Sequence, residues 1–421
     1  MTPGPTPLSR RRTLGAVGAL MAGSVINGLA AYAVVAVGTR SFGAATFAPV
    51  SVLWTFWALA VAAFTFPVQH WIIRTVEVDG HEGAVRRAVP GLVAANLGVS
   101  LLLGLVALVW RERLFGSTSL GWPLLVFAVS AGSAAAGYLR GVLAGRRRFA
   151  ATAAAIGTEN LLRLAATAVV VVTGASIGWF AACLAIGPLV ALGWPTVFRL
   201  EAGSPRHQHR LGEFLGGLAG GALLGQIALN AGPAVLAGIG GAAGDVTGVF
   251  ATLALFRAPY LLALGLATLL TGRLTALVVA GDETRLTRFR RRFLAATLAG
   301  TALSAAAGAT AGPAAVDVVF GSGVAPGATA VAALSAGSAL AFAALIALLV
   351  LVARGATAAI VGAWGWAMAA GLTMLVFSPA APLPTVAAAF VVVNAVAVAL
   401  MVVADMRWAG HSRTHDLPTV R

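Results

Sequence analysis

The sequence predicts an all-α integral membrane protein with about twelve transmembrane helices, arranged as two parallel repeats of six. Three observations lead to this prediction. Only 10% of the 421 residues are charged and 59% are hydrophobic, whereas a soluble domain carries about 25% charged residues. The apolar residues gather in stretches of the length that a membrane-crossing helix needs, about 20 residues. Short motifs also recur at one fixed distance along the chain.

Twelve apolar segments are the candidate spans. The first begins after Arg10-Arg11-Arg12 and is too long for the apolar core of an export signal, which has roughly 7–15 residues. The segment 291–312 is rich in alanine and glycine and needs helix neighbours to be stable, which favours a compact bundle. In chain order, the expected spans are 14–38, 47–73, 88–110, 121–144, 151–172, 175–198, 213–237, 246–271, 291–312, 328–352, 355–377 and 385–405.

The arginines fix the expected orientation of these spans. All 28 basic residues are arginine, and with the N-terminus inside, 23 of them fall on the cytoplasmic side. Only Arg40, Arg111 and Arg113 fall outside, while Arg163 and Arg257 lie within spans. Such a bias over short loops is the positive-inside pattern. We therefore expect a multi-pass protein of the bacterial inner membrane with both termini in the cytoplasm.

An internal repeat divides the twelve spans into two sets of six. Four matches share an offset of 205 residues, each at an equivalent place in the topology. An even number of spans per repeat gives both halves the same orientation, as in transporters built from parallel repeats. We expect an N-terminal lobe at 1–200, a polar cytoplasmic linker at 201–212 and a C-terminal lobe at 213–421. The matching pairs are Arg86-Arg87 with Arg291-Arg292, Leu114-Phe115-Gly116 with Val319-Phe320-Gly321, Ser130-Ala131-Gly132-Ser133 with Ser335-Ala336-Gly337-Ser338, and Ala151-Thr152-Ala153-Ala154 with Ala356-Thr357-Ala358-Ala359.

Ionisable residues at membrane depth are the first candidates for function, because burying them there costs about 2.5–3.5 kcal/mol on insertion scales. Arg257 lies in the eighth span with no carboxylate three or four residues away, and Pro259 beside it interrupts helix hydrogen bonding. A guanidinium there suits an anionic group such as phosphate, which it binds bidentately. The alternative roles are a salt bridge to another helix and snorkelling to the interface.

Other polar residues within spans are weaker candidates. Glu159 and Arg163 share a helix face at a spacing of four, so they are expected to form either a structural pair or a coupling pair. His70, near a helix end, is a candidate either for a pH-sensitive site or for a head-group contact. The remaining neutral candidates for a cavity lining or for helix bridging are Asn27, Gln226 and Asn230.

Several classes of function are excluded. The basic residues flank apolar spans as topology signals, so the net charge of +15 does not indicate nucleic-acid binding. The single cysteine, Cys183, gives no disulfide, and no cluster has the spacing of metal ligands. No phosphate-binding glycine-rich loop occurs. We therefore expect no cofactor and no metal, and a transporter rather than an enzyme.

Three segments carry a resemblance to a known family. They read Thr-Arg-Ser-Phe-Gly-Ala-Ala-Thr-Phe-Ala-Pro at 39–49, Arg-Gly-Val-Leu-Ala-Gly-Arg-Arg-Arg-Phe at 140–149 and Glu-Asn-Leu-Leu-Arg-Leu at 159–164. In these segments, and in its duplicated twelve-helix plan, the chain resembles the polysaccharide exporters of the multidrug/oligosaccharidyl-lipid/polysaccharide exporter superfamily. The likeness covers essentially the whole chain.

This resemblance implies a V-shaped exporter that flips a lipid-linked (polyprenyl-diphosphate) oligosaccharide across the inner membrane by alternating access. Its partners would be the lipid-linked sugar, membrane lipid and polysaccharide assembly proteins. The cavity residues it implies are Arg257, Gln226, Asn230, Asn27 and His70. Two alternatives stay open. A cation-coupled multidrug antiporter needs a cavity carboxylate, for which only Glu159 is available, and a non-transporting scaffold would pair Arg257 internally.

Overall fold

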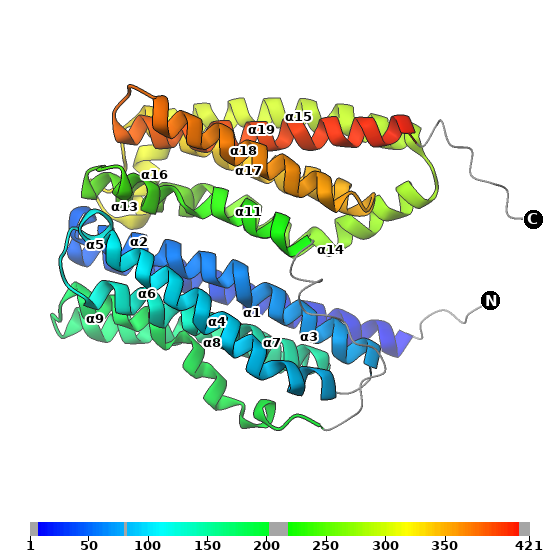
Figure 1. The fold of residues 1–421 in the computed structure, drawn as a ribbon, viewed down its shortest axis with the longest axis horizontal. Helices are drawn as coiled ribbons and strands as arrows, with labels where there is room; N and C mark the ends of the chain where they lie inside the picture. The colour runs from blue at the N-terminus through cyan, green and yellow to red at the C-terminus, as the bar shows by residue number, and fades with distance from the viewer. Residues whose placement is uncertain (1–6, 80–81, 202–217, 412–421) are drawn as a thin grey trace, which may run out of the picture. The chain divides into compact units, whose positions relative to one another are not determined.

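The computed structural model describes residues 7–79, 82–201 and 218–411, and these are almost entirely helical, with no β-strand among them. The chain forms two compact units, Met1–Ala219 and Gly220–Arg421, whose helices can be followed in Figure 1. Apart from residue 201, the predicted linker lies outside the described residues. The expected all-α fold with two sets of membrane-spanning helices is confirmed.

The first unit contains the helices of spans one to six. The first span is α1, which packs along α8, and the third span α4 packs on α6. The elements are α1 (Pro7–Phe42), α2 (Ala44–Ala60), the π-helix η1 (Val61–Thr65), α3 (Phe66–Asp79), α4 (Gly83–Val109), α5 (Arg111–Phe115), α6 (Gly121–Ala131), α7 (Ser133–Gly145), α8 (Phe149–Val172), α9 (Ile177–Ala182), and the 3₁₀-helices η2 (Cys183–Gly193) and η3 (Pro195–Phe198).

The second unit contains the helices of spans seven to twelve, with α17 at the centre of its contacts to α13, α14, α15 and α19. Its elements follow the same order as those of the first unit. They are α11 (Leu218–Asn230), α12 (Gly232–Gly238), α13 (Ala243–Phe256), α14 (Ala258–Val279), α15 (Glu283–Thr310), α16 (Gly312–Phe320), α17 (Ala328–Ala353), α18 (Thr357–Phe377) and α19 (Pro382–His411).

Nine helices among the described residues are long and apolar enough to cross a membrane. They correspond to nine of the twelve expected spans, including the weakly hydrophobic one, which becomes Glu283–Thr310. The other three expected spans are interrupted. The sixth changes into a 3₁₀-helix that contains Pro188, the seventh breaks after Asn230, and the eighth breaks at Arg257.

The sequence repeat corresponds to a structural one. In both units a short helix follows the third span and ends in a Phe-Gly pair, at Phe115-Gly116 in α5 and Phe320-Gly321 in α16. Both glycines have positive φ, 60° and 113°. Such angles are readily adopted only by glycine. The match at an offset of 205 residues therefore marks a short helix that ends at a glycine in both halves, although ψ angles of 26° and 151° give the two turns different conformations.

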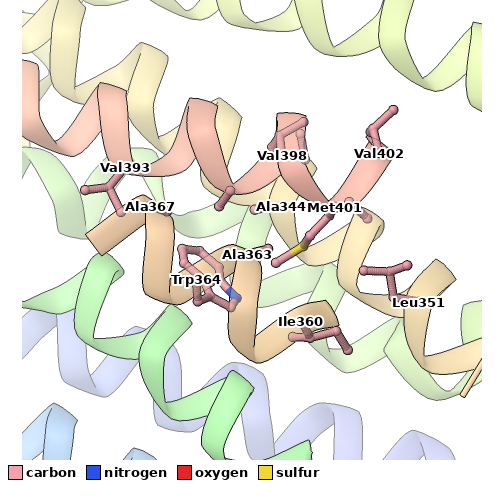
Figure 2. Packing of buried hydrophobic residues seen from close by; sticks show 13 residues of the cluster. Ala344, Leu351, Ile360, Ala363, Trp364, Ala367, Val393, Val398, Met401 and Val402 are labelled. Carbon is pink, nitrogen blue, oxygen red and sulfur yellow. The ribbon is translucent and has the colours of Figure 1, made fainter. Parts of the chain in front are cut away.

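Packing inside each unit depends on small side chains. In the second unit, a stripe on α18 at helical spacing, Ile360, Ala363, Trp364 and Ala367, contacts α19 residues such as Met401 (Figure 2). On the other side of α17, a Cβ added to Gly308 of α15 would lie 2.1 Å from Ser335 Oγ and 3.0 Å from Ala332 Cα. Close approach of this kind replaces the hydrophobic effect as the source of helix association in a bilayer.

A glutamate–arginine pair joins the third span to the fourth in the first unit. Glu82 is the N-cap of α4, and Arg146 is the C-cap of α7. Arg146 Nε and Nη2 bond the two Glu82 carboxylate oxygens at 2.6 and 2.8 Å. Arg146 also donates to the carbonyls of Thr196 and Arg199, both at 2.8 Å, at the end of the sixth span. One guanidinium thus ties three spans together.

The second unit has the same pair in the same place. Glu283 is the first residue of α15, and Arg354 is the C-cap of α17. Arg354 donates to both Glu283 oxygens at 3.0 and 3.3 Å, and to Asp405 near the end of the last span at 2.5 Å. In both units the acid lies at a helix N-terminus and the base at a helix C-terminus, where each complements the helix dipole.

Candidate functional site

Spans seven and eight are broken at points that contact each other. Asn230 ends α11, and Arg257 separates α13 from α14. Arg257 Nη1 donates to Asn230 Oδ1 at 2.6 Å. Prolines explain both breaks, since Pro233 follows the first and Pro259 the second, and a proline ring cannot continue the preceding helical turn. The two interruptions therefore form one local structure.

Arg257 is half-buried and bonds backbone carbonyls as well as Asn230. Its Nε donates to the carbonyl of Leu253 at 2.8 Å, and its Nη1 donates to that of Leu229 at 3.3 Å. In an unbroken α-helix the carbonyl of Leu229 would accept the N–H of residue 233, but that residue is proline and has none. The guanidinium supplies a donor that the helix lacks.

Two further polar side chains extend this cluster. Gln226, one turn before Asn230, donates from Nε2 to the hydroxyl of Tyr260 at 2.9 Å. Asn230 Nδ2 donates to the Gln226 side-chain and main-chain oxygens at 3.2 and 2.8 Å. The structure thus brings together Arg257, Gln226 and Asn230, three of the five expected cavity residues. The structure adds Tyr260 to the cluster. In the sequence, the only sign of this is that Tyr260 lies three residues after Arg257.

Glu159 belongs to a second charged cluster, inside the first unit. Its carboxylate forms ion pairs with Arg163 on its own helix, where the Nη2–oxygen distance is 2.9 Å, and with Arg140 from α7. All three side chains are mostly shielded, with exposed fractions of 4%, 2% and 12% for Glu159, Arg163 and Arg140. By sequence position Arg140 counts among the cytoplasmic arginines, yet its side chain turns back to Glu159. The carboxylate is therefore compensated twice.

Arg163 makes three further contacts inside the first unit. Its Nε donates to the carbonyl of Leu184 at 3.0 Å, its Nη1 donates to Asn160 Oδ1 at 2.7 Å, and its guanidinium lies 4.8 Å from the ring centre of Trp57. A Cβ on Gly187 would come within 2.2 Å of Nη2, so this arginine requires glycine there.

Arg163, like Arg257, donates to a carbonyl four residues before a proline, here Pro188. The local geometry differs, because Leu184 lies in a 3₁₀-helix, where a carbonyl accepts the N–H three residues on and Pro188 removes no donor from it. Arg163 therefore adds a donor to its carbonyl, whereas Arg257 replaces a missing one.

The other two expected cavity residues, Asn27 and His70, lie in the first unit. Asn27 on α1 is half-buried, its carbonyl accepts from Asn160 Nδ2 at 3.2 Å, and its Oδ1 is buried with no hydrogen-bond partner in the described structure. His70 on α3 is exposed, and its Nδ1 lies 2.7 Å from the carbonyl of Phe66. Among the described residues no group of three histidine, cysteine or carboxylate side chains is placed to hold a metal ion.

Comparison with known proteins identifies the fold. Neither a protein-family model nor a curated protein matches the chain. An inward-facing multidrug resistance transporter of the MATE family, in the MOP superfamily, aligns over 93% of this chain and 96% of its own, with a TM-score of 0.61 and 15% identity. A mutant of the Vibrio cholerae MATE transporter VcmN aligns over 96% and 99%, with a TM-score of 0.52 and 14% identity. A MATE protein in complex with MaD3S aligns over 95% and 97%, with a TM-score of 0.55 and 13% identity.

The chain therefore has the fold of the MATE transporters. The sequence resemblance led to the same superfamily but to a different branch, the polysaccharide exporters, and none of these three structures is described as one. At 13–15% identity the likeness concerns the fold, so it assigns no substrate.

Proposed function

We propose that this chain is an alternating-access transporter that exports small molecules across the bacterial inner membrane, with both termini in the cytoplasm. The observation that carries the proposal is the fold, which is similar over more than nine-tenths of the chain to multidrug transporters. A hydrogen-bonding cluster at paired helix breaks supports it. Irregular backbone at membrane depth is typical of transporter sites.

In this proposal the cluster of Arg257, Asn230, Gln226 and Tyr260 contacts the substrate. It offers a guanidinium, two amides and a phenol within otherwise apolar spans. Bonds to carbonyls and amides fix the orientation of the guanidinium before a ligand arrives. Such preorganisation lowers the entropic cost of binding.

Coupling through Glu159 is disfavoured by its surroundings. A cation site needs a carboxylate whose negative charge is not already balanced by neighbouring cations, whereas Glu159 forms ion pairs with both Arg140 and Arg163. Proton or sodium binding at this carboxylate would leave two buried guanidinium groups without their partner. We therefore assign Glu159 and Arg163 a structural role. In consequence, we expect Glu159→Gln to lower the stability of the protein rather than to change only the ion dependence of transport.

A lipid-linked oligosaccharide is the second candidate substrate, and the observation that favours it is the guanidinium of Arg257. Phosphate oxygens match the planar donors of arginine, and a diphosphate presents several. Asn230 and Gln226 carry the amide groups that commonly bond sugar hydroxyls.

Transport by purified protein in liposomes tests both candidates. We expect an accumulated drug or dye to be exported by the wild type, and Arg257→Gln to slow export at least tenfold. Arg273→Gln is the matched control, because Arg273 is an exposed arginine on α14, the helix that follows Arg257. A labelled polyprenyl-diphosphate sugar in the same liposomes decides the second candidate.

Arg257→Lys and a measurement of thermal stability separate binding from folding, because lysine keeps the charge but loses the planar donor arrangement. An Arg257→Gln protein that is folded and transports as fast as the Arg273 control would refute the binding role. A wild type that moves neither substrate class would refute the function.

A further inference from the structure

The duplicated Arg86-Arg87 and Arg291-Arg292 motifs lie outside the candidate substrate site. Arg86 and Arg87 lie near the start of α4, and Arg291 and Arg292 are the ninth and tenth residues of α15. These two helices are the third span of each unit. The N-terminal end of each of these two helices is expected on the cytoplasmic side. The side chains of these four arginines are exposed. The neighbouring Arg290 differs from them, because it is partly buried and bonds Asp405 at 3.0 Å.

On α15 the exposed arginines share one face. Arg288, Arg291 and Arg292 are spaced by three and four residues, so they project to the same side of the helix. No ion pair joins these three to a carboxylate in the part of the chain that the structure describes. The same side continues with Leu298 and Leu303, which are 74% and 70% exposed. We call this surface the α15 face.

The length of α15 places these arginines at head-group level. Its 28 residues span about 42 Å at 1.5 Å per residue, compared with a hydrocarbon core of about 30 Å. About 20 residues cross such a core, and counted back from Thr310 they begin at residue 291. Arg288 therefore lies beyond the core and Arg291 and Arg292 lie at its edge, while the leucines lie within it. Only 6% of its apolar window is buried, so most of this helix remains open to lipid.

On α4 the same arrangement recurs. Arg86 and Arg87 are exposed, and the helix continues with the exposed residues Val93, Leu97 and Leu101. We call this surface the α4 face. Two helices of equivalent position thus carry a basic end followed by an apolar side.

We propose that the α15 face and the α4 face are binding sites for anionic phospholipid. The phosphodiester accepts hydrogen bonds from the guanidinium groups, and an acyl chain lies along the leucines below. Charge selects the occupant, because a zwitterionic lipid offers the same chain but no net negative charge. This proposal is independent of which substrate the protein transports.

Thermal unfolding of the purified full-length protein in detergent tests the proposal. Phosphatidylglycerol and phosphatidylcholine with identical acyl chains are titrated separately. We expect phosphatidylglycerol to raise the melting temperature and phosphatidylcholine to have little effect. Each arginine near the surface of an anionic membrane gives about a fivefold gain in affinity. Substituting all three arginines of the α15 face by glutamine should therefore weaken binding at that face about a hundredfold.

Variants of both faces make the test decisive. The variant with Arg288→Gln, Arg291→Gln and Arg292→Gln should lose part of the phosphatidylglycerol effect, and adding Arg86→Gln and Arg87→Gln should remove the rest. Arg113→Gln is the control, an exposed arginine on the side expected to be external.

Equal stabilisation by both lipids would show that acyl chains alone bind, and would overturn the proposal. So would a five-site variant that keeps the full response, or an Arg113 variant that loses as much as the α15 variant. If the five-site variant does not fold, native mass spectrometry of the α15 variant against wild type gives the same comparison, with loss of selectively bound phosphatidylglycerol as the expected result.

Discussion

Replacing Gly187 by alanine tests whether the buried arginine of the first unit holds its helices together. The new Cβ would lie 2.2 Å from Arg163 Nη2, 2.3 Å from Cζ and 2.7 Å from Nε. The guanidinium would have to move by about 1 Å to reach an ordinary contact distance. It cannot do so while keeping its bonds to the Leu184 carbonyl and Asn160 Oδ1, which measure 3.0 and 2.7 Å.

The expected cost follows from these two bonds. A hydrogen bond to a charged group is worth about 1.5–3 kcal/mol, so losing two lowers the free energy of unfolding by about 3–6 kcal/mol. For a unit of roughly 200 residues, each kcal/mol shifts the melting temperature by about 2–4 °C. We therefore expect Gly187→Ala to melt on the order of 10 °C below wild type.

Tryptophan fluorescence during heating of the detergent-solubilised protein measures this shift. Gly193→Ala is the matched control, because Gly193 lies in the same 3₁₀-helix and a Cβ there meets nothing within 4 Å. The control should melt close to wild type. A Gly187→Ala protein within about 2 °C of the control would show that Arg163 moves aside without cost, and the structural role argued for it would be wrong.

Two further predictions concern the joints between spans. Burial acts to raise the pKa of Glu82, but hydrogen bonds from Arg146 and from the amide of Glu201, with the arginine charge, hold it below its usual value of 4.5. A carboxylate whose pKa is lowered by folding stabilises the protein fully at pH values above its unfolded-state pKa. This stabilisation is lost as the pH falls through the folded-state pKa. Melting temperatures measured from pH 6 down to pH 3 should therefore fall more steeply for wild type than for Glu82→Gln, and parallel curves would contradict the pair's contribution. Gly308→Ala should lower the melting temperature by several degrees because its Cβ meets Ala332 Cα at 3.0 Å, whereas Gly300→Ala, with open space, should not; equal effects would refute tight packing there.

Much of the fold can be predicted from composition and periodicity. Arginine sidedness and the 205-residue offset divide the chain into two sets of spans, and the repeated Phe-Gly pairs mark the end of a short helix in both units. Where the helices break is harder to predict. Pro259 signals the break at Arg257, but a change from α to 3₁₀ geometry around Pro188 leaves the apolar pattern unaltered.

The candidate sites show the same division. Glu159 and Arg163 are four residues apart, so their pairing follows from helix geometry. Arg140 on α7 bonds Glu159 on α8, and Arg146 bonds Glu82, which lies 64 residues earlier in the chain. No local spacing encodes such contacts. The equivalent pair in the second unit, Glu283 with Arg354, is displaced from the common offset, so the repeat alone does not reveal it.

The partnership between Arg257 and Pro233 has a consequence for how this sequence can change. Pro233 leaves the carbonyl of Leu229 without its helical donor, and Arg257 supplies one. If the proline alone were replaced, the restored N–H would compete with the guanidinium for that oxygen. If the arginine alone were replaced, a bare carbonyl would face a medium without water. We therefore expect replacement of both positions to be tolerated better than replacement of either one alone, although 24 residues separate them.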